Sequence, residues 1–258
     1  MMKRVLFCLI MVLSWYSWSA ADDAERPIHV FVEALFHHAA VDGAVQKPDV
    51  HVLGAEVDLD STLGLEDVNG LVGKAGIVLY GRHEIVADYR RYHLAEDTTL
   101  ASSMHFGDMD LSANLPISPS LTFQTIGLFY GFRLIETERG FLAIRPGVEF
   151  VKYDLGIKAR LLWFEWTSET YAGDYTVPFL LIAAESKLHP LVSIAGEFSG
   201  GMLDKQKAYL AQLLLKITPH PNFSALAGYS RVWFKDETKD NLFEITFSGF
   251  LIGCQFVW

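Results

Sequence analysis

Long stretches of this sequence alternate, residue by residue, between an apolar side chain and a small, polar or charged one. IHVFVEALFH, from residue 28, carries apolar side chains at every second position, with His29, Glu33 and His37 among the others. LVGKAGIVLY, FLAIRPGVEFVKY and YLAQLLLKI repeat the pattern. A period of two residues is that of a β-strand, whose successive side chains point to opposite faces of a sheet. The pattern therefore predicts an all-β fold.

Two all-β architectures give such strands: a soluble sandwich with its apolar face inward, and a membrane barrel with its apolar face toward lipid. The expected strands are about 10 residues or longer, which matches the ~9–11 residues of a membrane-crossing strand better than the usual 5–6 of soluble sheets. Aromatic residues crowd the strand ends, as in LFYGF, LLWFEW and YSRVWF, and aromatic girdles lie at membrane interfaces. We therefore predict a closed antiparallel transmembrane β-barrel.

The number of strands is expected to be even, as in single-chain bacterial barrels. Counting alternating segments favours twelve strands and leaves ten as the alternative, because 98–114 alternates poorly and the tight turn GRH at 81–83 falls on the long-loop side of a twelve-strand count. The twelve expected strands span 28–38, 50–60, 70–80, 84–94, 98–114, 121–135, 141–159, 175–188, 191–201, 206–218, 222–234 and 242–258.

The amino terminus has the layout of a secretory signal peptide. Lys3 and Arg4 precede the apolar run VLFCLIMVL, and small residues follow up to Ala21. We expect a signal peptide over 1–21, a short periplasmic lead over 22–27 and one barrel domain over 28–258.

The last twelve residues, FSGFLIGCQFVW, carry the most specific signal. Every second residue back from the end is apolar, namely Trp258, Phe256, Cys254, Ile252 and Phe250, and the intervening positions include Gln255, Gly253 and Gly249. This segment resembles the carboxy-terminal signature of Gram-negative outer-membrane proteins. The resemblance implies location in the outer membrane and a closing strand in which Phe250, Ile252, Phe256 and Trp258 form the assembly signal. It also implies as partners the barrel-assembly machinery during biogenesis, and outer-membrane lipids and lipopolysaccharide afterwards.

Charged residues on the polar faces are candidates for the lumen. Charges of both signs either line a narrow pore or neutralise each other and plug it, so the leading hypothesis is a non-catalytic role as a small channel for passive transport or as a structural membrane protein. The candidate lumen residues are Glu33, Glu56, Asp58, Lys74, Arg145, Glu149 and Lys216, with Asp88, Arg90 and Arg133 on strands that alternate less clearly.

Two polar patterns suggest chemistry without specifying it. Glu56, Asp58 and Asp60 face one way at steps of about 6.7 Å, so they form an acid–base or Ca²⁺ candidate, or a lumen row paired with Lys74 and Arg90. His29, Glu33 and His37 look like a ligand set, but residues four apart on a strand are ~13 Å apart and do not share one ion. We predict no metal and no other cofactor.

The alternative function is an outer-membrane barrel hydrolase acting on phospholipid or lipid A. The outer-membrane phospholipase family uses an H-x-S spacing, which this chain lacks, and HFGDMD at 105–110 only loosely matches the acidic and His–Asp pairs of omptin-type proteases. No catalytic residue is assigned. The net charge of −10 and the lack of basic clusters exclude nucleic acid as a partner.

Overall fold

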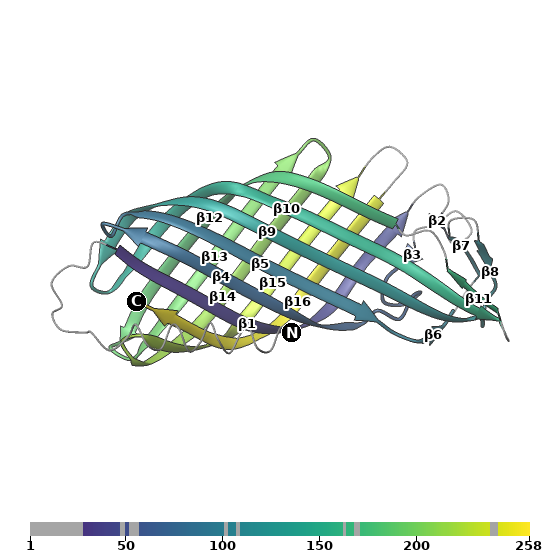
Figure 1. Ribbon diagram of the computed structural model, residues 1–258, viewed down its shortest axis with the longest axis horizontal. Coiled ribbons are helices and arrows are strands. Elements are labelled where there is room, and N and C mark those ends of the chain that lie inside the picture. Colours follow the sequence, from purple (N-terminus) through teal and green to yellow (C-terminus); the bar gives the residue numbers. More distant parts are fainter. Residues whose placement is uncertain are drawn as a thin grey trace.

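The computed structural model describes residues 28–46, 50–51, 57–100, 103–106, 109–161, 164–167, 171–237 and 242–258. Within them, ten long antiparallel strands close into a barrel (Figure 1). They are β1 (Ile28–Gln46), β4 (Asp67–Leu79), β5 (His83–Ala95), β9 (Pro116–Thr137), β10 (Gly140–Leu161), β12 (Tyr171–His189), β13 (Val192–Leu203), β14 (Gln206–His220), β15 (Phe223–Glu237) and β16 (Leu242–Val257). The described residues contain no helix long and apolar enough to cross a bilayer.

The barrel closes where its last strand meets its first. β16 pairs antiparallel with β1 from Phe31↔Val257 to Gln46↔Leu242. Val30 and Trp258 extend this ladder with two backbone hydrogen bonds, of 2.8 and 3.0 Å. The expected closing strand is thus the strand that joins the two ends of the chain.

The two ends of the barrel differ, and we call them the turn end and the loop end. At the turn end, the connections 80–82, 138–139, 190–191 and 221–222 are two or three residues long. The loop end holds the connection 47–66 and the connection 96–115, together with 162–170, 204–205 and 238–241. It also carries the short strands β2 (Val50–His51), β3 (Val57–Asp58), β6 (Thr98–Thr99), β7 (Met104–Phe106), β8 (Met109–Leu111) and β11 (Phe164–Thr167), on the right of Figure 1.

The structure has the ten strands of the alternative count, and not twelve. The segments 50–60 and 98–114 were expected to cross the membrane, but their described parts form only short strands and turns at the loop end. Without these two crossings, the tight turn at 80–82 falls at the same end as the other short turns. The irregularity in the twelve-strand count is therefore removed.

The polarity of the inner and outer faces reverses along the long strands. In the turn-end part of β10, Val148 and Phe150 point outward and are 37% and 50% exposed, whereas Arg145 and Glu149 are buried inside. Beyond Phe150 the inward residues Val151, Tyr153 and Leu155 are apolar and buried. The outer face there carries charged residues such as Lys152 and Lys158.

β9 shows the same reversal of polarity, so the reversal is a property of the barrel and not of one strand. Leu128 and Tyr130 are exposed outside the turn-end half, while Leu121 and Phe123 are buried inside the loop-end half. The turn-end half therefore has the apolar exterior of a transmembrane barrel and an interior that holds buried charges beside apolar side chains such as Val86 and Leu181. The loop-end half has the polar exterior and apolar interior of a soluble protein.

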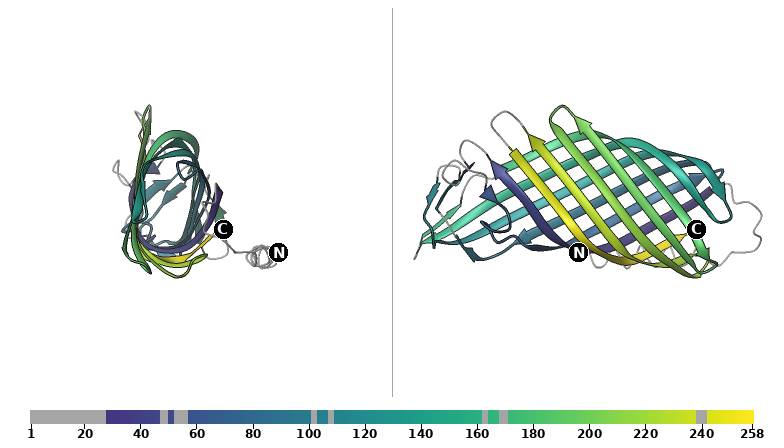
Figure 2. Two further views of the ribbon diagram at one scale, coloured as in Figure 1. Left: turned by 90° about the vertical axis from the view of Figure 1, so that its left-hand side faces the viewer. Right: turned by 180° about the vertical axis from the view of Figure 1, so that it is seen from behind.

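Strand length explains why both patterns fit in one barrel. Each of β9 and β10 has 22 residues, which at about 3.4 Å per residue extend about 75 Å along the strand. Even at a tilt of ~45°, this exceeds the ~25 Å apolar band of an outer-membrane barrel. Figure 2 shows the strongly tilted strands from behind and the closed wall end-on. The loop-end half therefore projects beyond the apolar band.

A hydrophobic core fills the loop-end half. It combines inward residues of the long strands with the loop residues Leu59, Leu63, Leu65 and Leu100, all fully buried. Two parallel ring pairs lie within it: Tyr153 with Phe243, at 3.8 Å between centroids, and Tyr92 with Phe247, at 4.1 Å. This half of the barrel is therefore packed with side chains, as a soluble protein core is.

Candidate functional site

The inward side chains of β5 lie at successive levels of the barrel interior, from the turn end to the loop end. Its inward residues, in order, are Glu84, Val86, Asp88, Arg90, Tyr92 and Leu94, and all are buried. From the turn end to the loop end, these side chains are an acid, an aliphatic residue, an acid, a base, an aromatic residue and an aliphatic residue. The interior therefore has charged layers in the turn-end half and an aromatic layer above them.

A network of ion pairs crosses the lumen nearest the turn end. Glu84 accepts hydrogen bonds from the Nε atoms of Arg133 and Arg145, the second at 2.6 Å. Arg145 also donates to Glu197 at 3.1 Å, and Lys74 donates to the other oxygen of Glu197 at 2.5 Å. Because each buried charge here has an opposite partner, the network offsets part of the large cost of desolvating its members.

Further polar pairs surround this network toward the turn end. Gln255 donates to Glu33 at 2.7 Å, and Lys216 lies 3.3 Å from Glu185. Glu185 also accepts a hydrogen bond of 2.8 Å from Ser193. These pairs come from β1, β12, β13, β14 and β16, so they line the wall opposite β5 and β9.

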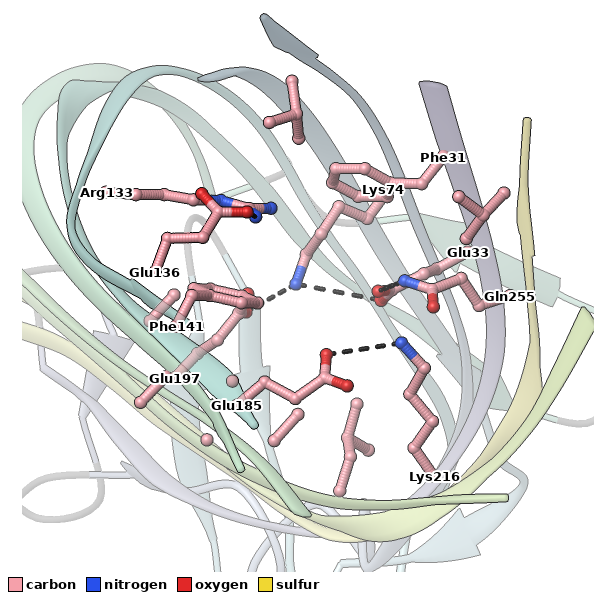
Figure 3. Close-up of a pocket in the computed structure, with 18 of the residues that line it drawn as sticks. Phe31, Glu33, Lys74, Arg133, Glu136, Phe141, Glu185, Glu197, Lys216 and Gln255 are labelled. Carbon is pink, nitrogen blue, oxygen red and sulfur yellow. Dashed lines mark hydrogen bonds and ion pairs between the residues drawn. The ribbon is translucent and has the colours of Figure 1, made fainter. Parts of the chain in front are cut away.

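A pocket of about 360 Å³ lies between these groups (Figure 3). Its inner end is formed by Lys74, Arg145 and Glu197. Its rim includes exposed residues of the strand ends, among them Glu136 and Lys187, so the pocket opens at the turn end. Figure 3 shows Lys74 reaching into the centre of the lumen, with Glu33 on one side and Glu197 on the other.

A second charged layer lies deeper, between the pocket and the aromatic rings. Arg90 is fully buried there, and its electrostatic neighbours include Asp88 and Glu149. His37 joins this layer to the next through a 2.8 Å hydrogen bond between its Nδ1 and the hydroxyl of Tyr92. Charged side chains therefore occupy the interior up to the level at which the aromatic core begins.

The structure brings together several of the residues predicted from sequence to face the lumen. Glu33, Lys74, Arg145 and Lys216 all line the pocket, and Glu149 is buried in the deeper layer. Asp58 does not lie with them. Glu56 lies outside the described residues.

Asp58 belongs to the short strand β3, which pairs with residues 44–45 of β1 at the loop end. The expected row of carboxylates paired with Lys74 and Arg90 is therefore wrong for Asp58 and Asp60, because both lie in a loop-end segment and not on a barrel strand. Burial opposes ionisation of Asp58, but hydrogen bonds from Asp60 and Ser61 outweigh it and lower the pKa of Asp58. The hydrogen bond to Asp58, followed by partial burial, raises the pKa of Asp60.

The described side chains were compared with the metal-ligand set and the serine–histidine pair considered from the sequence. These residues contain no group of three or more potential ligands able to hold an ion. His29 lies at the pocket rim and His37 is buried further along β1, so the two are separated as the strand spacing predicted. No serine–histidine hydrogen bond occurs among the described side chains, and those of LLWFEW and of His105 lie outside that set.

The sequence did not single out several residues that complete the pocket. Glu136, Glu185, Glu197 and Gln212 line it, and Glu84 lies behind it as the partner of Arg133 and Arg145; all five lie on the long strands. Alternation alone places Glu84 and Glu197 on polar faces. Alternation does not show which strands face each other across the lumen, so it could not identify the partners of these two residues.

The ten-strand closed antiparallel barrel is a fold of the outer-membrane β-barrel class. The chain is similar to the outer membrane protease OmpT from Escherichia coli, with a TM-score of 0.60 at 10% identity, covering 93% of this chain and 99% of that chain. Because the identity is so low, this likeness shows the fold alone.

Two further matches are more distant. The translocator domain of the autotransporter NalP from Neisseria meningitidis has a TM-score of 0.47 at 11% identity, covering 98% of this chain and 96% of that chain. The outer membrane protein OprG from Pseudomonas aeruginosa has a TM-score of 0.41 at 10% identity, covering 89% and 95%. No protein-family model and no curated protein sequence matches the chain.

Proposed function

We propose that this chain is a non-catalytic, structural barrel of the outer membrane whose lumen does not conduct. Of the two non-catalytic roles that the sequence left open, the filled interior favours the structural one over the passive channel. The turn end faces the periplasm and the projecting loop end faces outward, since short turns are periplasmic and longer loops external in this class.

The observation that carries this proposal is the succession of buried layers along the barrel axis. Above the pocket, a path along the barrel axis meets the ion-paired Lys74, Arg145 and Glu197. It next meets buried Arg90 and finally the stacked rings of the aromatic core. An ion crossing this interior would have to displace paired charges and then enter an apolar layer, which costs far more than thermal energy.

The outer surface supports the membrane location. Phe250 and Ile252 of the closing strand are 72% and 64% exposed, and Phe198 and Leu213 are similarly exposed on other strands. Apolar side chains exposed on many strands of one band are costly in water and favourable in lipid. In this proposal, residues 1–21 direct export, the closing strand is used by the barrel-assembly machinery, and lipids and lipopolysaccharide surround the band.

A flux assay on proteoliposomes tests the proposed function. We expect vesicles containing the folded barrel to swell in an isotonic solution of a small sugar no faster than vesicles without protein. A general diffusion porin serves as the positive control. Swelling that rises in proportion to the amount of folded barrel would overturn the proposal and restore the channel hypothesis.

A further inference from the structure

We propose that the turn-end pocket binds a compact, water-soluble zwitterion that carries a primary ammonium group. This inference adds a ligand site to the structural role proposed above. It is independent of that role, because a barrel with a closed lumen can still bind a solute in a pocket that opens at one end.

The first support is a set of hydrogen-bond acceptors without donors. Gln212 Oε1 and Gln255 Oε1 are buried and have no hydrogen-bond partner among the described residues, and Glu33 Oε2, also without a hydrogen bond there, has a long ion pair of 3.9 Å with Lys74 Nζ. All three residues line the pocket. An unsatisfied buried polar atom costs about 1–3 kcal/mol, and each of these oxygens can only accept. A ligand that supplies N–H donors to this wall therefore relieves a cost already built into the fold.

The second support is the presence of cations near these acceptors. Lys216 has three N–H donors, and its ion-pair partner among the described residues is Glu185, at 3.3 Å. In Figure 3 the oxygen of Gln255 and the ammonium of Lys216 face the same space. Lys187 adds a second, exposed cation at the rim. These groups provide a place for an anionic group at a short distance from the acceptors.

The charge balance selects a zwitterion over a simple ion. The charged residues that line the pocket, together with Glu84 behind them, form five carboxylates and five cations: Glu33, Glu84, Glu136, Glu185 and Glu197, with Lys74, Arg133, Arg145, Lys187 and Lys216. A ligand with net charge would leave this half-buried site unbalanced, which is costly at low effective dielectric. A molecule carrying both signs preserves the balance.

The volume of the pocket limits the size of the ligand, and the opening at the turn end sets its route of entry. A volume of about 360 Å³ holds a molecule of about a dozen heavy atoms, and pockets of ~300–1,000 Å³ are typical of small-molecule sites. Phe31, Phe141 and Leu214 offer apolar contact for a short carbon chain. Because the barrel wall separates the pocket from lipid, the ligand enters as a free solute from the turn end.

Calorimetric titration of the folded barrel in detergent micelles tests this inference. The probes are two zwitterions, glycerophosphoethanolamine and L-alanyl-L-alanine. Each is paired with an analogue whose ammonium is trimethylated and has no N–H: glycerophosphocholine and N,N,N-trimethyl-L-alanyl-L-alanine. We expect saturable one-site binding of at least one zwitterion, and at least tenfold weaker binding of its trimethylated analogue.

Variants locate the site. Gln212→Met removes an acceptor and Lys216→Met removes a cation, and each is expected to weaken binding at least fivefold. Gln124→Met makes the same glutamine change on the outer face of β9 and should leave binding unchanged. Heat-modifiable gel mobility confirms folding, and if one pocket variant does not fold, the other decides.

Three results would overturn the inference. They are the absence of saturable heat with both zwitterions, equal binding of a zwitterion and its trimethylated analogue, and unchanged binding by a folded pocket variant. The first would indicate that water alone satisfies the three acceptors. A barrel that conducts but binds the zwitterion would refute only the proposed structural function.

Discussion

Glu84 of β5 and Arg145 of β10 form a 2.6 Å hydrogen bond across β9, the strand between them. Gly131 lies beneath this pair: a Cβ atom at that position would be 2.8 Å from Cγ of Arg145 and 3.0 Å from Oε2 of Glu84. The glycine therefore provides the space in which the two side chains meet. The ion network therefore depends on the absence of a side chain at Gly131 as well as on its charged residues.

Gly131→Ala should destabilise the barrel by about 1–3 kcal/mol, the usual cost of overfilling a packed interior. The added methyl displaces Arg145 and Glu84 from their hydrogen bond. The free energy of unfolding in urea, measured in detergent micelles, provides the check. Gly73→Ala is the matched control, because the nearest atom to its added Cβ is 4.0 Å away. Equal stabilities of the two variants would contradict the role given to Gly131.

Glu84→Gln should cost more than the same change at Glu136. Glu84 is fully buried and pairs with both Arg133 and Arg145, whereas Glu136 is exposed and pairs with Arg133 alone. Breaking a buried pair costs about 3–5 kcal/mol of unfolding free energy. Because each arginine keeps a second carboxylate partner, we expect a loss near the lower of these values for Glu84→Gln. An exposed pair contributes about 0–1 kcal/mol. Urea unfolding of the two variants side by side distinguishes them, and similar losses would refute the buried network.

The carboxyls of Asp58 and Asp60 should titrate apart, with Asp60 above the usual range and Asp58 below it. The raised pKa of Asp60 means that its contribution to stability is present at acid pH and is lost as the pH rises through that pKa. The lowered pKa of Asp58 gives a contribution that is present above the unfolded-state pKa and is lost as the pH falls. Carbon-detected NMR titration measures both groups.

In the Asp58→Asn variant the same titration should show the pKa of Asp60 moving back toward its ordinary value, because the ionised partner is gone. An unchanged titration of Asp60 in that variant would show that Asp58 is not its partner.

Trp258→Asp should impair assembly, since Trp258 pairs with Val30 at the barrel seam and stacks on Phe256 at 6.0 Å between centroids. A carboxylate there would lie at the edge of the apolar band without a partner. Membrane fractionation and heat-modifiable gel mobility report the folded fraction, with Trp258→Phe as the control. Normal insertion of the aspartate variant would argue against an assembly role for this residue.

Much of the architecture could be predicted because alternation is a local property. The sidedness of β1, with Glu33 and His37 inside and Phe36 outside, followed from the period of two residues. The closing position of β16 was implied by the resemblance of its sequence to the outer-membrane carboxy-terminal signature. The strand number did not follow, because 50–60 contains alternating residues that nevertheless lie in a loop-end connection. Alternation shows that a segment can form a strand, and does not show that the strand reaches across the barrel.

The pairing inside the pocket could not be predicted, for a different reason. Lys74 and Glu197 are 123 residues apart and meet only because the closed barrel brings β4 and β13 face to face. The reversal of pattern at Phe150 was also missed. Lys152 and Lys158 continue the same alternation with the opposite sense, so period alone does not show where the apolar band ends.

Single-channel recording in a planar bilayer tests the closed lumen most directly. Folded barrel, verified by heat-modifiable mobility and inserted from detergent, should show no unitary currents above the bare-membrane baseline at 1 M salt. The double variant Glu84→Gln/Arg145→Met should also remain silent, because the aromatic core of Tyr92, Phe247, Tyr153 and Phe243 closes the loop-end half independently. Reproducible unitary steps from the unmodified barrel would contradict the closed lumen.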